Sequence, residues 1–407
     1  MEPYDRWAAA QARRAFRDVP RRESQGARSG VIQLKRHPAL REVLANIAGK
    51  LAHDDEGMPL PGAAGRRARR TDLHHLFGDR ALMDRVAARA GETVVPAAVN
   101  DIVDHTRIQF TRTSEEIYGH LGAARLATLD GRAIDDGTPT EDAWTIDVED
   151  YAVLFELDRL RAEGFGHKPA KLPRYDCLVV DEAQELAPLE LALLGRSLDR
   201  GGTLIVAGDA GQQIDPAASF LGWESTMRDL SAGRYETATL QISYRCPEPV
   251  TEVARALRAP RGVAEVFSMP QGPISCARAE HELHLASWLV DELRRLRHLD
   301  PLASIALLCR THEGAQTWAR HLNHGLDVRL ALEGRFDFKP GVTSTSVAEV
   351  KGLEFDYAIL PDAAPASYPD LPEARRALYV AVTRATHRLV LATPGRWSPL
   401  LDVKDES

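Results

Sequence analysis

The chain has 407 residues, of which 44% are hydrophobic and 27% charged, and its formal net charge is -8 at pH 7. This length and composition predict two or three domains with substantial cores. No apolar run approaches the roughly 18 residues that span a bilayer, and residues 1–5 do not resemble a signal peptide, so we expect a cytoplasmic protein without membrane contact. The net charge argues against indiscriminate coating of nucleic acid, although it permits a local basic groove.

The cysteines and histidines give no sign of a metal site. The cysteines are far apart and form no C-x-x-C pair, which excludes an obvious disulfide framework or zinc site: Cys177, Cys246, Cys276 and Cys309. Three of them lie in or beside expected strands, which predicts reduced, buried thiols. The pair His74-His75 has no acidic or cysteine companion at ligand spacing and is interpreted as surface histidine.

The first 170 residues are expected to be largely helical. Arginine clusters at 13–14, 21–22 and 66–70 punctuate helical segments such as 39–51. These clusters could contact phosphate backbones or form a solvated helix face. Residues 144–162 have apolar side chains at helical spacing and lead through a loop into the next segment.

Residues 175–180 form an apolar run that ends in the carboxylates of Asp181 and Glu182. The pattern predicts a buried parallel strand that delivers both acids to the carboxyl edge of a sheet, where open α/β sheets bind their ligands. One carboxylate there can hold Mg²⁺, and a second can orient or deprotonate a water. The alternative is a strand followed by the acidic first turn of a helix.

Two further strands are expected downstream. A helix over 188–198 and a Gly-Gly break precede a buried strand over 203–207, which ends in the polar segment 208–213. Gln212 at this edge could orient the terminal phosphate or water, unless the segment is simply a turn of small residues. A third strand over 238–242 runs into Tyr244-Arg245, where an aromatic ring can stack on a base beside a guanidinium that reaches a phosphate.

Residues 373–385 predict a helix with Arg384 near its end, followed by a strand over 388–392. A guanidinium fixed on a rigid element can stabilise charge on a transferring phosphoryl group. The alternative is a surface arginine near a helix C-terminus.

In this order the segments resemble the motifs of the UvrD/Rep family of superfamily 1 helicases, over about residues 173–392. The matching segments are 179–184 for motif II, 208–212 for motif III, 243–245 for motif IV, 350–356 for motif V and 373–385 for motif VI. The resemblance implies an α/β fold with two RecA-like P-loop NTPase domains, the first incomplete, and a helical N-terminal insertion. The implied domains are 1–172, a partial domain 1A with the insertion; 173–245, the rest of domain 1A; and 246–407, domain 2A.

The same resemblance implies a site for ATP and Mg²⁺ and a nucleic-acid partner, single-stranded DNA first. Asp181 would hold Mg²⁺, Glu182 would activate water and Gln212 would sense the γ-phosphate. The remaining implied contacts to the nucleotide are Tyr244 on the adenine, Arg245 and Arg384 at the γ-phosphate, and Gly352 with Glu354 beside the ribose.

Within the family the chain is most similar to the HelD-like branch, whose members associate with bacterial RNA polymerase. The likeness is carried by residues 144–157, 31–51 and 346–352, where the main family has a histidine in place of Ala348. The short spacing between Arg310-Thr311 and motif V also leaves no room for the large second accessory domain of UvrD and Rep. RNA polymerase is therefore a second expected partner.

The sequence contains no P-loop of the form G-x-x-x-x-G-K-[ST], whose backbone cradles phosphates. Only Lys50 of the seven lysines follows a glycine, and Leu51 stands where Ser or Thr is needed. Three explanations are open: the chain is a fragment, a separate chain supplies the P-loop, or a strand over 31–34 or 93–99 fills the gap in a protein that no longer hydrolyses ATP. In each case we expect this chain alone to be a poor ATPase.

The motifs and the missing P-loop lead to two hypotheses for the function. The first is an ATP-dependent helicase or translocase that acts on nucleic acid or remodels RNA polymerase. Classical duplex unwinding is not expected, because the segment after motif III lacks the aromatic residues that stack on bases, with Phe220 and Trp223 the nearest. The alternative is a non-catalytic, helicase-fold binding module that contacts RNA polymerase or nucleic acid.

Overall fold

The computed structural model describes most of the chain, with gaps. The described residues are 2–16, 18–24, 27–48, 67–95, 97–111, 142–213, 220–240, 245–258, 272–332, 335–337, 339–401 and 403. The chain forms two compact units: Met1–Gly208 with Asp215–Tyr235, and Asp209–Ile214 with Glu236–Ser407. The domain boundaries expected at residues 172 and 245 stay predictions.

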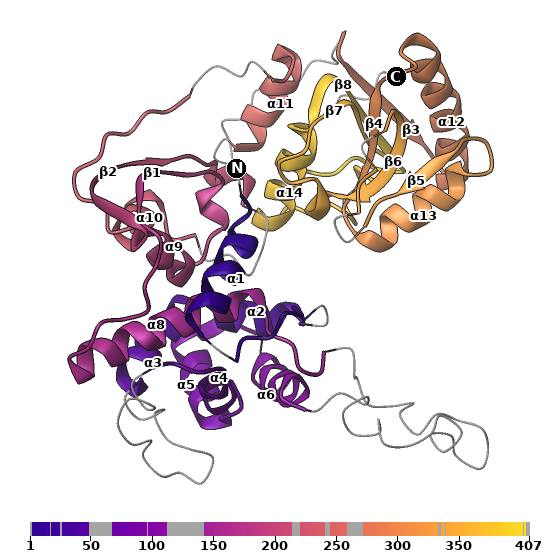
Figure 1. Ribbon diagram of the computed structural model, residues 1–407. Helices are drawn as coiled ribbons and strands as arrows, with labels where there is room; N and C mark the ends of the chain where they lie inside the picture. Colours follow the sequence, from indigo (N-terminus) through magenta and orange to yellow (C-terminus); the bar gives the residue numbers. More distant parts are fainter. Residues whose placement is uncertain are drawn as a thin grey trace, which may run out of the picture. The chain divides into compact units, whose positions relative to one another are not determined.

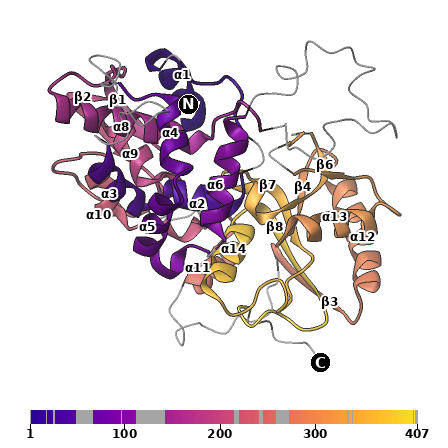
Figure 2. The same ribbon diagram turned by 90° about the horizontal axis from the view of Figure 1, so that it is seen from below.

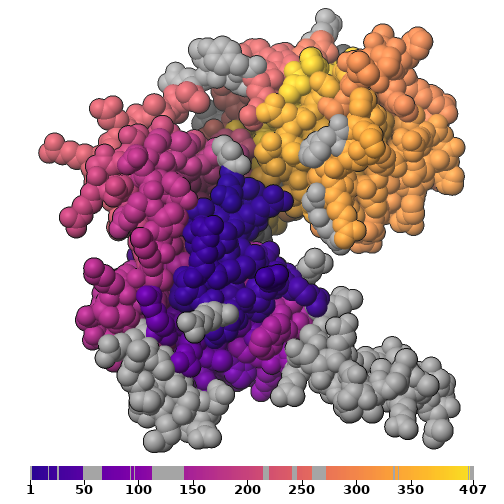
Figure 3. Space-filling view, viewed as in Figure 1, coloured from indigo at the N-terminus to yellow at the C-terminus, as the bar shows by residue number. Residues whose placement is uncertain are grey.

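Helices form the N-terminal part of the first unit (Figure 1, Figure 2). They are α1 (Tyr4–Ala15), α2 (Ser29–Arg36), α3 (Pro38–Ile47), α4 (Arg70–Phe77), α5 (Arg80–Ala90), the short η1 (Gly91–Thr93), α6 (Ala98–Gln109) and α8 (Val148–Phe165). In the space-filling view the indigo N-terminal segment lies against the magenta segment of the same unit, where α1 packs on α8 (Figure 3).

Helix α8 is the central helix of this part. Eleven of its 18 residues are buried, because α1, α2, α3, α4 and α9 all pack against it. It starts at residue 148, later than the expected 144, since Asp147 and Asp150 form a capping box that fixes its first turn. It ends at Phe165 and is followed by Gly166, whose φ of +66° suits a glycine cap.

The prediction that a strand over 31–34 or 93–99 fills a gap in the sheet is wrong. Residues 31–34 lie inside α2, where Val31 and Leu34 are three residues apart and both buried, so they share one helix face. Of the described residues in 93–99, Thr93 ends η1, and Ala98 and Val99 begin α6.

A two-stranded parallel sheet forms the rest of the first unit. Strand β1 (Tyr175–Val180) pairs with β2 (Leu198–Val206), and η3 (Ala183–Glu185) and α9 (Pro188–Gly195) connect them. Helix α10 (Trp223–Asp229) packs on α9. The expected strand-helix-strand order is therefore present.

The two faces of this sheet differ in burial. Val180 packs in a cluster with Ala183, Leu191 and Leu230, while Leu178, Leu204 and Val206 lie partly buried against that cluster. On the other face Val179 is 56% exposed and its partner Ile205 is 50% exposed. The expectation of a fully buried strand is thus wrong for one face, because no described element covers it.

A six-stranded parallel sheet organises the second unit, in the order β3-β8-β7-β4-β6-β5. The strands are β3 (Ile274–Ala279), β4 (Ser304–Cys309), β5 (Val328–Leu330), β6 (Gly341–Ser346), β7 (Phe355–Leu360) and β8 (Ala385–Pro394). The predicted α/β class, with parallel sheets and a helical N-terminal part, is confirmed and is consistent with RecA-like domains.

Helices cover both faces of this sheet, as the parallel arrangement requires. Helices α12 (Glu282–Leu299) and α13 (His312–Leu322) bury one face, and α11 (Glu248–Arg258) and α14 (Pro372–Val382) bury the other. The short η4 (Ala210–Gln212) and η5 (Val347–Val350) complete the unit.

The expected strand over 238–242 is not formed in its described part. Residues 238–240 have no regular structure, and Leu240 is 93% exposed. The following residues, including Tyr244, lie outside the described residues. A strand needs a neighbour for its backbone, and none of the described strands pairs with this segment.

The structure also bears on the predicted burial of the cysteines and on membrane-spanning helices. Cys309 is buried as predicted, whereas Cys177 is exposed on the open face of β1, which corrects the expectation of buried thiols there. No described helix is long and apolar enough to cross a membrane.

Candidate functional site

The two candidate carboxylates follow β1 directly. Asp181 is exposed, and its Oδ1 accepts a bond from the backbone N–H of Glu182 at 2.9 Å. Glu182 has a left-handed φ of +51° and accepts from Nε2 of Gln184 at 2.6 Å. Gln184 is fully buried, so a core side chain fixes the direction of the Glu182 carboxylate. The site thus offers one solvent-facing acid and one oriented acid.

The end of β2 approaches this turn closely at Gly208. A Cβ at position 208 would lie 2.1 Å from Oε1 of Gln184 and 2.8 Å from the ring of Trp223. The backbone N–H of Ala183 also donates to the Ala207 carbonyl at 3.0 Å. The absence of a Cβ at Gly208 therefore lets the two strand ends meet beside Glu182 without displacing Gln184 or Trp223.

Among the described residues, no group of three or more His, Cys, Asp or Glu side chains is arranged to hold a metal ion. A protein carboxylate commonly binds Mg²⁺ together with waters and substrate phosphates, without a complete protein cage. The exposed carboxylate of Asp181 suits that kind of binding.

In the second unit, Arg384 lies between α14 and β8 and is only 1% exposed. The predicted helix over 373–385 ends earlier, at Val382, so Arg384 is held by tertiary contacts. Its Nε and Nη1 donate to the carbonyls of Val380 and Leu353, both at 3.1 Å, and Nη2 donates to Oε1 of Gln212 at 2.6 Å. The structure thus brings Gln212 and Arg384 into direct contact.

Asp209 holds the Gln212 segment in place. Its Oδ2 accepts from the hydroxyl of Tyr379 at 2.8 Å, and its Oδ1 accepts from the Gly211 N–H at 2.9 Å. Arg258 lies 3.7 Å from the same carboxylate. Burial and the neighbouring Asp209 raise the pKa of Tyr379 to about 12, so its hydroxyl stays a donor at neutral pH.

The remaining predicted residues lie at the turn before β7. Arg245 forms an ion pair with Glu354 at 2.5 Å, and both side chains are partly exposed. Gly352 has a φ of +69°, a conformation that glycine adopts without a steric cost. Their roles toward a nucleotide stay predictions.

Sequence reasoning missed the residues that support these groups. Asp209 and Tyr379 both lie inside segments that resemble helicase motifs, but the sequence pattern gives neither a role. A carboxylate at a strand end and an aromatic hydroxyl on a helix gave too little signal, because each has several common partners. The amide of Gln184 and the guanidinium of Arg258 give an equally weak signal, because each of these groups also has several common partners.

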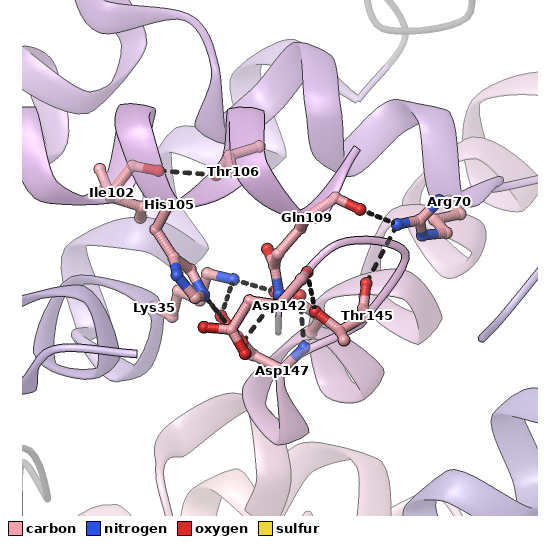
Figure 4. Close-up of polar contacts among 10 residues, drawn as sticks. Lys35, Arg70, Ile102, His105, Thr106, Gln109, Asp142, Thr145 and Asp147 are labelled. Carbon is pink, nitrogen blue, oxygen red and sulfur yellow. Dashed lines mark hydrogen bonds and ion pairs between the residues drawn. The ribbon is translucent and has the colours of Figure 1, made fainter. Parts of the chain in front are cut away.

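Lys35 is one of the seven lysines of the chain, and it lies in the core of the first unit. Its side chain is fully buried, and Nζ lies 2.6 Å from Asp147 (Figure 4). The same Nζ lies 2.7 Å from Asp150. His105 and Gln109 also bond to Asp147, at 3.0 and 2.8 Å. Burial alone would lower the pKa of Lys35, but the two carboxylates outweigh it and raise the pKa. Lys35 therefore forms buried ion pairs, and its ammonium group is not available to a phosphate.

A comparison with known protein families finds a match within the second unit. Residues 341–392 match the family model of the UvrD-like helicase C-terminal domain. This range includes Gly352, Glu354 and Arg384, and leaves Asp181, Glu182, Gln212 and Arg245 outside.

One solved structure that matches is the C-terminal domain of a possible DNA helicase from Lactobacillus plantarum WCFS1. The match is 24% identical, covers 40% of this chain and 96% of that chain, and has a TM-score of 0.33. No curated protein matches the chain.

Proposed function

We propose that the chain is part of a UvrD-like, ATP-dependent helicase or translocase that acts on nucleic acid, single-stranded DNA first. The match of residues 341–392 to the UvrD-like helicase C-terminal domain carries this proposal. The contact between Gln212 and Arg384 supports it, because it joins the predicted motif III residue to a residue inside the matched segment.

In this proposal the residues have separate tasks. Bound Mg-ATP would supply the phosphoryl group whose hydrolysis drives the cycle. Asp181 would bind the Mg²⁺, and Glu182, oriented by Gln184, would orient or deprotonate the attacking water. Arg384 donates to four protein oxygens, of Val380, Leu353, Thr383 and Gln212, and we propose that a γ-phosphate would take the place of Gln212 among them. Gln212 would thereby report the state of the phosphate to α14.

The residues fit Mg²⁺ better than they fit the ATP phosphates. The sequence has no G-x-x-x-x-G-K-[ST] segment, and Lys35 is buried in an ion pair. We therefore propose that the chain alone is deficient as an ATPase and that its P-loop comes from outside these 407 residues, for example from a separate polypeptide.

The test is ATP turnover by the purified chain and by the chain joined to a family P-loop segment. We expect negligible turnover by the chain alone and nucleic-acid-stimulated turnover after joining, which Glu182→Gln abolishes. Rapid turnover by the chain alone that is lost in Glu182→Gln would refute the deficiency. Continued inactivity of the joined protein would count against the helicase proposal.

A second candidate is a non-catalytic binding module that contacts RNA polymerase or nucleic acid. The burial of Arg384 at 1% exposure favours it, since a core arginine can be kept for its packing and hydrogen bonds. A pull-down that recovers polymerase equally with wild type and with Arg384→Lys, with no nucleotide bound to either, would favour this candidate. Loss of recovery upon nucleotide addition would favour the first.

A further inference from the structure

A cluster of flat side chains lies in the first unit, outside all the helicase motifs. The guanidinium of Arg70 lies over the ring of Phe110 at 4.0 Å and over the ring of Trp144 at 4.4 Å. The ring of His74 lies 4.8 Å from that of Phe110. We call these four residues the aromatic-arginine cluster. They come from α4, from the end of α6 and from the segment before α8.

Hydrogen bonds fix the cluster in place. Arg70 is 3% exposed, and its Nη2 donates to the carbonyls of Gln109 at 2.6 Å and Thr145 at 3.0 Å (Figure 4). The backbone N–H of Trp144 donates to the same Gln109 carbonyl at 3.0 Å. The expectation that the arginines of 66–70 form a solvated helix face is therefore wrong for Arg70, which is a core residue.

Trp144 is a large aromatic member of the cluster that lies at the surface, as His74 also does. Its side chain is 48% exposed, whereas Trp7 and Trp318 are 7% and 4% exposed. Its φ of +54° lies in the left-handed region, which is unfavourable for a bulky aromatic residue. A strained conformation persists where the surroundings enforce it, and such residues concentrate at functional sites. Here the surroundings hold an indole ring at the surface.

The chemistry of this surface suits a nucleobase. Every base presents a π-face, so an exposed, rigid indole can stack on single-stranded nucleic acid regardless of sequence. Burial lowers the pKa of Arg70 only to about 10, so a positive charge remains next to the indole at neutral pH. Arg69 and Arg107 lie on the same elements, one residue before Arg70 and three before Phe110, although Arg107 also pairs with Asp104 at 3.6 Å.

We propose that Trp144 is a stacking platform for a base of single-stranded nucleic acid, preorganised by Arg70 and Phe110. The proposal rests on the nucleic-acid partner of the proposed function and adds a contact site in the helical part of the first unit. Preorganisation makes the contact favourable because little freedom is lost when the base binds.

The test measures binding of the full chain to labelled oligothymidylate by fluorescence anisotropy. Trp144→Phe keeps an aromatic face and is expected to bind within a few-fold of wild type. Trp144→Leu keeps an apolar side chain without a π-face, and its Kd is expected to rise about 5- to 150-fold. The control is Trp288→Leu, which removes another exposed tryptophan, 39% exposed on α12, and is expected to leave the Kd unchanged.

An oligomer of the same length made of abasic deoxyribose phosphates separates stacking from a general disturbance of the fold. Wild type and Trp144→Leu are expected to bind it equally, because it offers phosphates and no bases. Equal losses for both oligomers, or equal Kd values of Trp144→Leu and Trp144→Phe for oligothymidylate, would overturn the proposal. Oligouridylate in a parallel series assigns the preference between DNA and RNA.

The outcome also separates this proposal from the proposed function. If wild type binds oligothymidylate and Trp144→Leu binds it equally well, the stacking platform is refuted and the nucleic-acid partner stands. If wild type binds neither oligothymidylate nor oligouridylate, the nucleic-acid partner is refuted and the platform with it.

Discussion

Lys35 is a single residue on which the helical part of the first unit depends. Its ammonium group lies between the carboxylates of Asp147 and Asp150, and Asp147 also forms the N-cap of α8. Replacing a buried charge leaves its partners uncompensated in a medium that solvates them poorly. The network therefore joins α2 to the first turn of α8.

We expect Lys35→Met to lower the free energy of unfolding of the first unit by about 3–5 kcal/mol, because two buried carboxylates lose their counter-charge. Urea unfolding followed by circular dichroism measures the change. Arg28→Met is the control: Arg28 pairs with Asp101 at 2.5 Å but is 75% exposed, and its loss should change the free energy by less than about 1 kcal/mol. Similar losses in both variants would contradict the assignment.

Asp362 gives a prediction about pH. It lies after β7 and accepts from the Arg310 N–H at 2.8 Å. Burial raises its pKa from 3.8 to about 6, so the folded state binds a proton more tightly than the unfolded state does. Its contribution to stability is therefore full below about pH 4 and falls as the pH rises to about 6, by up to about 3 kcal/mol.

Asp362→Asn should remove this pH-dependent loss, because the amide oxygen still accepts from Arg310 and cannot ionise. Thermal unfolding between pH 4 and pH 7 measures it. Asp356→Asn is a control for which the pH dependence of stability has the opposite sign. Hydrogen bonds from Ser304 and the neighbouring His387 overcome burial and lower the pKa of Asp356. Its contribution is present above the unfolded pKa of 3.8 and is lost as the pH falls below it, so this control extends the thermal unfolding series below pH 4. A wild-type slope retained by Asp362→Asn would refute the assignment.

At the scale of elements, the carboxyl ends of β1 and β2 approach each other closely at Gly208, where a larger residue would displace its neighbours. Gly208→Ala would place a Cβ within 2.1 Å of Gln184, the residue that orients Glu182. We expect it to destabilise the first unit by about 1–3 kcal/mol through overpacking. Gly164→Ala in α8 is the control, because its Cβ would meet nothing within 4 Å and alanine favours a helix. Denaturant midpoints compare the two variants, and an equal or higher midpoint for Gly208→Ala would contradict the model of close approach.

The sequence predicted elements best where one local pattern decides them. The strand over 388–392 lies within β8 and the helix near 373–385 is α14, because the first is a short apolar run and the second has apolar residues at helical spacing. The segment 238–242 has the composition of a strand, but its described residues pair with no described strand. A strand depends on a neighbour that local sequence does not reveal.

The candidate site could be predicted only as separate groups. Asp181 and Glu182 follow β1 as expected, and Gln212 meets Arg384, but the burial of Arg384 and its four acceptors depend on the fold of the second unit. The same limit applies to Arg70 and Lys35. Both are charged residues for which sequence favours solvent, and both lie in the core because partners distant in sequence satisfy them.

At the scale of the whole molecule, each core cluster of the described residues lies within one unit. Leu44 belongs to the cluster of the helical part, and Leu307 to the cluster beneath α12 and α13. Both side chains are 0% exposed. Two compact units with separate cores are expected to open with separate free energies.

Leu44→Ala and Leu307→Ala test this separation, because each leaves a cavity in one core and should cost about 2–5 kcal/mol. Hydrogen exchange measured by mass spectrometry follows both units in one experiment. Leu44→Ala is expected to accelerate exchange in α3 and α8 while β4 and β6 keep their wild-type rates, and Leu307→Ala should give the reverse. Distant sites without shared partners have additive effects, so the double variant should reproduce both patterns together. Acceleration of β4 and β6 by Leu44→Ala, equal to that in α3, would show that the cores open as one and would contradict the division into two units.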